Sequence, residues 1–170
     1  MTACESNPSQ RGFAYLWVLL TVALLGLSLS LVAEVHMTLT QRDKEAELLS
    51  IGRQYREALR RYQERQVGGL RQYPSSMEEL LLDSRGPTVT RHLRQVFVDP
   101  MTGKAEWGVV RVDGRIVGVH SLSEHRPLKQ AGFDDDDAAF AQARTYRDWV
   151  FSYPSDIVLK FPKGVQPAAP

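Results

Sequence analysis

Apolar residues dominate one long run near the start of the chain, from Phe13 to Ala33, in which Thr21, Ser28 and Ser30 carry the polar hydroxyl groups. The run contains no charged residue and no proline, and at a helical rise of about 1.5 Å per residue it spans roughly 30 Å, the thickness of a bilayer's hydrocarbon layer. Tyr15 and Trp17 lie near its start, where aromatic rings favour the headgroup level. The hydroxyl of Thr21 can bond a carbonyl one turn back. We therefore expect a transmembrane helix over residues 13–33.

A helical pattern continues beyond this run, because no proline occurs between Pro8 and Pro74. Apolar or aromatic residues recur at spacings of three and four and predict one buried face: Leu48, Ile51, Tyr55, Leu59 and Tyr62. Charged residues occupy the opposite face: Arg42, Lys44, Arg53, Arg56, Glu57, Arg60, Arg61, Glu64 and Arg65. The two halves predict one helix of about 55 residues that ends near Gly68-Gly69. Its apolar positions last too few heptads for a coiled coil.

Shorter elements follow the long helix. Ser75 with Glu78, or Ser76 with Glu79, predicts a capping box at the start of a short helix. Residues 105–112 and 115–121 predict a hairpin, since Asp-Gly supplies the positive φ of a two-residue turn. The alternation places Trp107, Val109 and Arg111 on one face of its first strand and Gly108, Val110 and Val112 on the other, without deciding which faces the helix. Residues 149–153 and 157–161 predict two more strands.

These elements predict an α+β fold, in which a long N-terminal α-helix packs on a small antiparallel β-sheet. The predicted organisation is a leader over residues 1–12, a membrane-spanning half of the helix over 13–33 and an amphipathic half over 34–67. A small α+β domain over 68–163 and a flexible tail over 164–170 complete the chain.

The charge, the cysteine content and the lack of catalytic motifs limit the classes of function that we expect. The net charge of +1 gives no bulk attraction for nucleic acid, so we expect no nucleic-acid partner. The single cysteine, Cys4, lies in the leader, so no disulfide is expected. No phosphate-binding loop occurs, and no nucleophile elbow accompanies Ser121 or Ser123, although histidines lie close to both. We expect a protein that is not an enzyme.

The junction Arg11-Gly12-Phe13 follows a short polar leader and opens the apolar run. This arrangement resembles the signature of type IV prepilins and pseudopilins. The resemblance implies that a prepilin peptidase cleaves between Gly12 and Phe13 on the cytoplasmic side and methylates the new amine. It also implies a single-pass protein of the inner membrane with a cytoplasmic N-terminus and a periplasmic C-terminal domain. Most of the family have a glutamate where this chain has Trp17, and members without it include the subunit at the filament tip.

Three later motifs are similar to those of pseudopilins of type II secretion. Tyr73-Pro74 precedes a leucine-containing short helix, Asp99-Pro100 precedes the first strand, and a loop runs from Ser121 through Pro127-Leu128-Lys129 to Gly132-Phe133. The resemblance implies a subunit of a periplasmic pseudopilus that drives protein export. Implied partners are other pilin or pseudopilin subunits and the inner-membrane assembly platform. The resemblance implies assembly through Phe13, Leu16, Trp17, Leu20 and Leu24.

Two other functions stay open on the sequence. The chain could be a minor pilin of a type IV pilus, although the cysteine loop that would favour a pilus is absent. It could also be a single-pass anchored periplasmic domain that never polymerises. In that case the junction Arg11-Gly12-Phe13 belongs to an ordinary signal anchor. A membrane-tethered enzyme would need a pocket that the sequence does not indicate.

Two candidate metal sites arise from the sequence, although no cofactor is expected. The run Asp134, Asp135, Asp136 and Asp137 could bind calcium, which the resemblance to major pseudopilins also suggests. The alternative is that Asp136 or Asp137 caps a helix over residues 138–144. His120, Glu124 and His125 could form part of a zinc site, but their spacing does not suit tetrahedral ligation and His120 is expected to be a strand residue.

Overall fold

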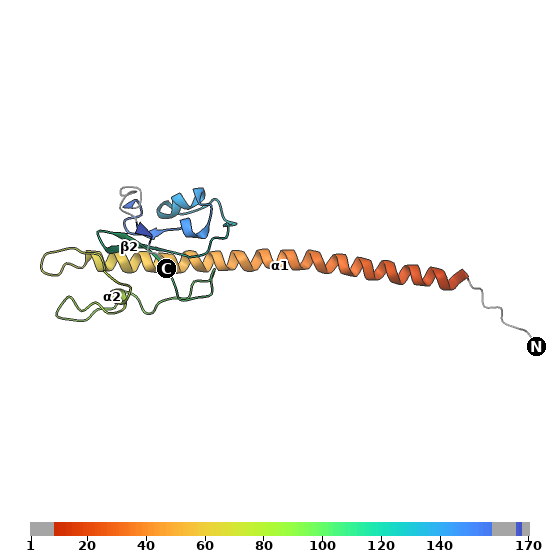
Figure 1. Cartoon of the computed structure of the whole chain (residues 1–170), viewed down its shortest axis with the longest axis horizontal. Coiled ribbons are helices and arrows are strands. Elements are labelled where there is room, and N and C mark those ends of the chain that lie inside the picture. Colours follow the sequence, from red (N-terminus) through yellow and green to blue (C-terminus); the bar gives the residue numbers. More distant parts are fainter. Residues whose placement is uncertain (1–8, 158–165, 168–170) are drawn as a thin grey trace, which may run out of the picture. The chain divides into compact units, whose positions relative to one another are not determined.

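The computed structural model describes the backbone of residues 9–157 and 166–167, and the side chains of residues 13–26 and 37–157. Helix α1 (Ser9–Glu64) passes through two compact units, residues 1–41 and 42–170 (Figure 1). Its 56 residues confirm the prediction of one long helix. The part of the predicted leader before Ser9 lies outside the described residues.

The C-terminal end of α1 differs from the expectation. The helix ends at Glu64, before Gly68 and Gly69, which have φ angles of 63° and 78°. Backbone hydrogen bonds join Val67 and Leu70 in both directions around the two glycines, with N···O distances of 3.3 and 3.2 Å. The glycine pair therefore forms a tight turn of its own after the helix rather than the helix cap, because both positions need positive φ.

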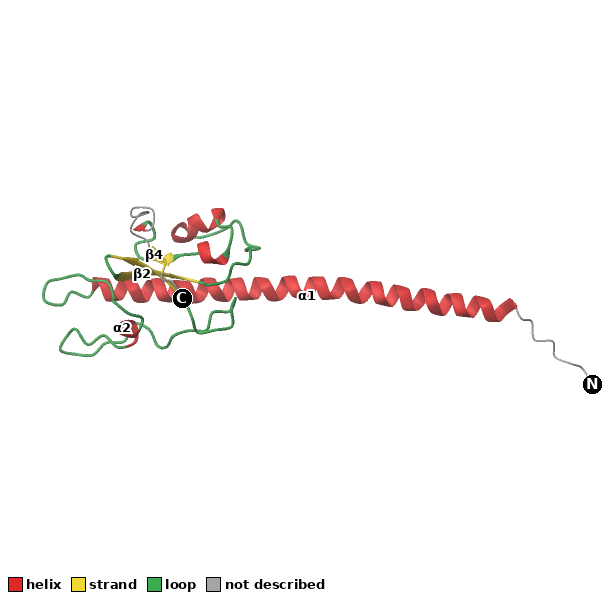
Figure 2. Ribbon diagram, in the orientation of Figure 1, coloured by secondary structure: helices red, strands yellow, loops and turns green. Residues whose placement is uncertain are grey.

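The second unit is α+β, with a small antiparallel sheet (Figure 2). Strands β1 (Gly108–Val112) and β2 (Arg115–His120) form the predicted hairpin, with Asp113 and Gly114 at φ 50° and 75° in its turn. Strand β3 (Phe151–Ser152) pairs with β2, and β4 (Gln166–Pro167) pairs with β1. The order of the described strands is β3-β2-β1-β4.

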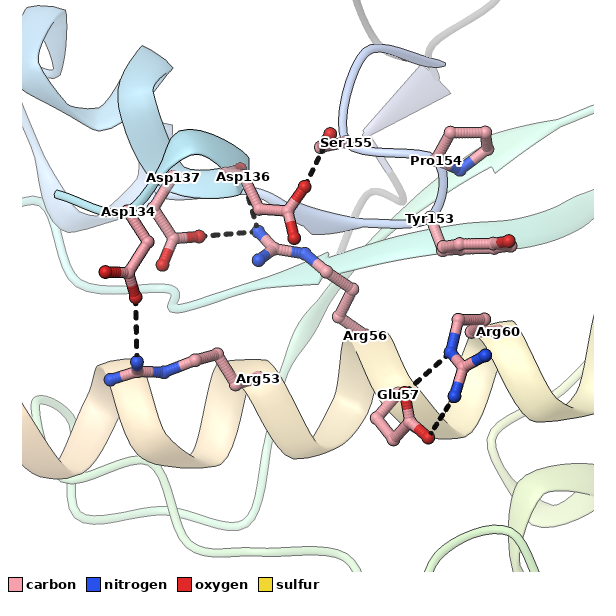
Figure 3. Close-up of a pocket in the computed structure, with 10 residues that line it drawn as sticks. All are labelled: Arg53, Arg56, Glu57, Arg60, Asp134, Asp136, Asp137, Tyr153, Pro154 and Ser155. Atoms are coloured by element: carbon pink, nitrogen blue, oxygen red, sulfur yellow. Dashed lines mark hydrogen bonds and ion pairs between the residues drawn. The ribbon is translucent and has the colours of Figure 1, made fainter.

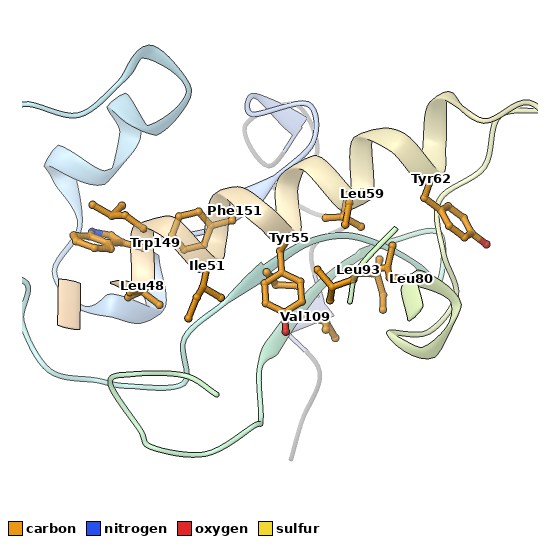
Figure 4. Packing of buried hydrophobic residues seen from close by; sticks show 14 of the residues in the cluster. Leu48, Ile51, Tyr55, Leu59, Tyr62, Leu80, Leu93, Val109, Trp149 and Phe151 are labelled. Atoms are coloured by element: carbon orange, nitrogen blue, oxygen red, sulfur yellow. The ribbon is translucent and has the colours of Figure 1, made fainter. Parts of the chain in front are cut away.

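The predicted apolar face of α1 builds the core of this unit. Figure 4 shows its side chains among residues of the sheet and loops. All five predicted positions are buried: Leu48, Ile51, Tyr55, Leu59 and Tyr62. They cluster with Leu80, Leu93, Val109, Val119, Trp149 and Phe151. Val109 and Trp107 thus identify the strand face that packs on α1, whereas Val110 joins Val117 and Ile157 in a smaller cluster.

Tyr55 links the helix to the loop before the sheet. Its hydroxyl accepts a hydrogen bond from the backbone N–H of Phe97 at 3.1 Å, and its ring centroid lies 5.0 Å from that of Trp107. The Trp107 indole N–H in turn donates to the Phe97 carbonyl at 2.8 Å. Burial raises the pKa of Tyr55 to about 12, so this hydroxyl keeps its proton at neutral pH.

The described part of the unit also contains the short helices α2 (Glu78–Leu81), η1 (Asp135–Gln142) and η2 (Tyr146–Asp148), the last two of 3₁₀ type. The N-cap of α2 is Met77 and has no side-chain capping bond, so neither predicted pair forms a capping box. Instead, the N–H of Ser75 donates to Glu79 at 3.0 Å, and the Ser75 hydroxyl also contacts that carboxylate. The same carboxylate accepts a hydrogen bond from the Tyr62 hydroxyl at 2.5 Å. Glu79 therefore fastens the segment before α2 to α1.

The structure differs from two predictions for the end of the chain. Ile157 lies in a helical turn rather than a strand, and its N–H donates to the carbonyl of Pro154 at 3.1 Å. The rest of that predicted strand, residues 158–161, lies outside the described residues. The segment expected to be a tail contains β4, which pairs with Val110 and Arg111 of β1.

The predicted membrane span is helical in the structure, although the side chains of its residues 27–33 lie outside the described set. Within the part of the chain that the structure describes, no helix has both the length and the apolar character needed to cross a bilayer.

Candidate functional site

The first candidate site is the apolar surface of α1 over residues 13–25, which we call the apolar segment. Its large apolar side chains are between 48% and 65% exposed: Phe13, Tyr15, Leu16, Trp17, Val18, Leu19, Leu20, Val22, Leu24 and Leu25. Consecutive residues of a helix point in different directions around its axis. The exposed apolar surface of this segment therefore surrounds the helix and is not confined to one stripe.

All five residues predicted to act in assembly lie on the apolar segment. Phe13 and Leu16 are 64% and 63% exposed, and Trp17, Leu20 and Leu24 are likewise exposed. The Phe13 and Trp17 rings meet edge to face, with centroids 6.3 Å apart.

The predicted processing residues lie at the start of α1. Phe13 follows Gly12 within the helix, which already begins at Ser9. The hydroxyl of Thr21 donates to the carbonyls of Trp17 and Val18 at 3.0 and 2.9 Å, which confirms the expected bond one turn back. This polar group is therefore satisfied within the helix, as an apolar environment requires.

The second candidate site is a groove of about 520 Å³ in the second unit, between α1, the start of η1 and the turn at Pro154 (Figure 3). We call it the charged groove. Seven of its ten lining residues are charged: Arg53, Arg56, Glu57, Arg60, Asp134, Asp136 and Asp137. Tyr153, Pro154 and Ser155 complete the lining.

Arginine side chains from α1 engage two of the four consecutive aspartates. Asp134 pairs with Arg53 at 3.0 Å on the surface, and Asp137 pairs with Arg56 at 2.6 Å in the interior. The Asp136 carboxylate instead accepts a hydrogen bond from the Ser155 hydroxyl at 3.2 Å. A calcium ion would need these carboxylates to converge on one position, whereas each of them contacts a different group of the protein.

The expected helix cap at this run is wrong. The helix η1 begins at Asp135, so neither Asp136 nor Asp137 precedes it, and the residue at its N-cap, Asp134, makes no side-chain capping bond. The physical reason is competition, because guanidinium groups of α1 bind the Asp134 and Asp137 carboxylates. Among the side chains that the structure describes, no group of three or more His, Cys, Asp or Glu residues is placed to hold a metal ion.

Arg56, which the sequence places on the charged face of α1 opposite the apolar residues, is instead buried. It is 8% exposed, and its guanidinium donates to the carbonyls of Ser152 and Asp136 as well as to the Asp137 carboxylate. Arg56 thus joins the helix, β3 and η1. A buried pair of this kind is costly to break, since loss of one partner leaves the other charge unpaired in the interior.

Glu57 and Arg60 occupy the opposite end of the charged groove. Hydrogen bonds from Arg60, and secondarily from Arg61, lower the pKa of Glu57 to about 2. Arg60 also bonds Glu64 at 3.0 Å, so each of these cations has an acidic partner on the helix. The charges of the groove are therefore largely neutralised by one another.

The histidines and serines considered as catalytic or zinc residues make local contacts. His120 is a buried residue of β2, as expected, and its Nδ1 lies 2.8 Å from the Ser121 carbonyl oxygen. Burial lowers the pKa of this imidazole. The Ser121 hydroxyl donates to Asp99 at 2.7 Å, whereas Ser123 Oγ lies 3.1 Å from His125 Nδ1.

Two buried carboxylates escaped the sequence analysis. The first, Glu45, accepts hydrogen bonds from the backbone N–H groups of Leu128 and Lys129 and, at 2.8 Å, from the Tyr146 hydroxyl. The burial of Glu45 could have been predicted from the sequence. Glu45 and Arg56 lie on one helical stripe with Leu49 and Gly52, at spacings of three and four. Charged residues on an apolar stripe indicate buried polar contacts.

The second is Asp83, whose side chain is fully buried. Arg65, Arg85 and His92 contact its carboxylate at 3.2, 2.9 and 3.1 Å. Hydrogen bonds from Arg85, with a further one from His92, hold the pKa of Asp83 well below its usual range. No local sequence pattern marks this cluster, because its members come together only when the loop of residues 82–92 folds against α1.

Comparisons with protein-family models, with curated proteins and with solved structures find no significant match for this chain. The functional interpretation therefore depends on the residues and geometry described above.

Proposed function

We propose that this chain is a pilin-like subunit of a type II secretion pseudopilus, anchored in the inner membrane by residues 13–33. In this proposal a prepilin peptidase cleaves between Gly12 and Phe13. The subunits then assemble through their apolar segments into a periplasmic filament that drives protein export. The role of the chain is mechanical, without catalysis.

The observation that carries the proposal is the exposure of the apolar segment. Ten large apolar side chains between Phe13 and Leu25 are about half exposed or more. Contiguous apolar surface of this extent is unfavourable in water and marks a membrane or protein interaction. Lipid before assembly, and neighbouring helices after it, would both cover a surface that surrounds the helix.

The fold of the second unit supports the same proposal. The amphipathic half of α1 buries its apolar face under a small antiparallel sheet. This leaves the helix clamped to a folded domain, while the residues before it remain available for lipid or for other subunits. A non-polymerising anchored domain is the main alternative, and a minor pilin is the alternative within the same class.

Processing is tested by the intact mass and N-terminal residue of the full chain, purified from membranes of a host with an active prepilin peptidase. We expect a chain that begins at methylated Phe13. Gly12→Leu should retain residues 1–12, whereas Gly26→Ala is a matched control because nothing lies within 4 Å of a Cβ placed there. A wild-type chain that keeps its leader would refute the pseudopilin assignment and favour the anchored domain.

Polymerisation is tested by cysteine cross-linking in the same membranes. Because the only cysteine is in the leader, a processed chain carries none and a single new cysteine reports one position. Leu16→Cys and Leu20→Cys should give cross-linked multimers when the assembly platform is present. Glu106→Cys, on the exposed part of the second unit, serves as the control. Processed but strictly monomeric chains would contradict assembly through the apolar segment.

A further inference from the structure

A second pocket, of about 330 Å³, lies at the beginning of the second unit. It is formed by the first turns of α1 in that unit and by the loop that precedes η1. Its lining combines two cations, one carboxylate and three apolar side chains: Arg42, Lys129, Glu45, Ala46, Leu49 and Leu128. We call it the basic pocket.

The charges of the basic pocket differ from those of the charged groove. The arginines of the charged groove are paired with carboxylates of the chain. By contrast, neither Arg42 nor Lys129 belongs to any ion pair recorded among the described residues. The Lys129 ammonium instead lies 4.8 Å from the centroid of the Phe133 ring. Within the part of the chain that the structure describes, these two cations therefore border the pocket without an ion-pair partner.

Glu45 is the only acid among the described residues that line this pocket, and the chain itself satisfies its carboxylate. Its carboxylate accepts hydrogen bonds from the backbone of Leu128 and Lys129 and from the Tyr146 hydroxyl. These bonds fix the loop beside α1 and so bring Lys129 into the same pocket as Arg42. With one buried carboxylate and two cations, the pocket keeps a net positive charge.

We propose that the basic pocket binds the phosphate of an anionic phospholipid headgroup. The two cations supply the charge complementarity, and Leu128, which is 43% exposed, supplies an apolar contact at the edge of the pocket. Polybasic groups near a membrane surface bind anionic lipids at about 1 kcal/mol for each cation, about a five-fold change in binding.

The choice of a lipid, rather than a soluble phosphate, rests on the proposed function. If residues 13–33 span the bilayer, only a few turns of α1 separate Ala33 from Arg42. Side chains of a helix generally tilt toward its N-terminus. Under the proposed function, this tilt would bring the Arg42 guanidinium toward the headgroup layer, where lipid phosphates are concentrated.

The test uses the full chain reconstituted in phosphatidylcholine nanodiscs that contain a phosphatidylglycerol with a photoreactive headgroup. Cross-linked positions are mapped by mass spectrometry after digestion with a protease that does not cut at lysine or arginine. We expect labelling of the segments that contain Arg42 and Lys129. Arg42→Gln and Lys129→Gln should each lower this labelling about five-fold.

Two matched variants separate charge from structure. Lys129→Arg keeps the charge and should keep the labelling. Arg94→Gln removes an exposed cation outside the pocket and should have no effect. Labelling that is equal in the wild type and in Lys129→Gln would overturn the proposal. Competition by millimolar glycerol 3-phosphate would also overturn it, because the pocket would then be a site for soluble phosphates.

Membranes of the expressing host, with an active prepilin peptidase, are analysed beside the nanodiscs and distinguish this inference from the proposed function. Extraction of the chain by alkaline carbonate, with no stable insertion, would refute the proposed span and with it the lipid site. An inserted and correctly processed chain without labelling at the basic pocket would refute the lipid site alone.

Discussion

Gly52 allows β3 to approach α1 closely, and its replacement gives a sharp test of the core. A Cβ built at Gly52 would lie 2.3 Å from three carbon atoms of the Phe151 ring. Ordinary contacts begin at about 3.5 Å, so the ring would need to move by about 1 Å. Phe151 has no exposed surface, and its ring centroid lies 5.1 Å from that of Phe140, which leaves it little space to move.

Two effects of Gly52→Ala oppose each other. Alanine favours the helix by about 1 kcal/mol relative to glycine. Overpacking of a filled core costs about 1–3 kcal/mol and more where the neighbours cannot shift. Since the contact is with a fully buried ring, we expect the clash to exceed the propensity gain. The net loss in the free energy of unfolding should be about 1–2 kcal/mol.

The assay is urea unfolding of the full chain in detergent micelles, followed by near-ultraviolet circular dichroism. Ser50→Ala, on the exposed side of the same turn, is the control and should change stability by less than about 0.5 kcal/mol. In a Phe151→Leu background the smaller side chain should relieve the clash, so that Gly52→Ala becomes neutral or stabilising. If Gly52→Ala in the wild-type protein instead raises the free energy of unfolding by about 1 kcal/mol, the close packing of β3 on α1 is refuted.

Three further predictions concern titratable groups and use the same unfolding assay. Asp83→Asn should destabilise the protein by roughly 3 kcal/mol at pH 7 because the cations around it lose their partner. Since the folded-state pKa of Asp83 is lowered, its contribution is present above about pH 4 and is lost as the pH falls further, so the variant should show a shallower acid-induced loss. Glu57→Gln should cost less than about 1 kcal/mol at pH 7, because its pairs with Arg60 and Arg61 are partly solvated; a larger loss would contradict this solvation. Burial lowers the pKa of His120, so its contribution to the free energy of unfolding is complete above about pH 6.5 and declines below that pH. If His120→Gln and the wild type lose stability equally between pH 7 and pH 5, the lowered pKa of His120 is refuted.

Periodic features of this fold could be predicted from the sequence. The five apolar positions from Leu48 to Tyr62 are all buried because a spacing of three and four places side chains on one side of a helix. The hairpin followed from Asp113-Gly114, since few other dipeptides adopt positive φ at both positions. In each case a local rule determines the structure.

Polar contacts between distant segments could not be predicted in this way. Asp137 is 81 residues from its partner Arg56, and Glu45 is 83 residues from Leu128. The local signal at the aspartate run favoured a helix cap, yet partners supplied by α1 took the carboxylates. A local preference loses when tertiary contacts offer a stronger partner for the same group.

The apolar residues of the two units differ in their surroundings, because those of the second unit form a buried core and those described in the first are exposed. The buried core of the second unit is assembled from Leu48 onward, without a contribution from the described side chains of residues 13–26. Folding of that unit therefore does not explain the apolar character of the first. Ten large apolar side chains exposed to water would instead lower solubility and promote association. Covering by lipid or by other helices would lower the free energy of such a segment, and this is why we propose that it serves in anchoring and assembly.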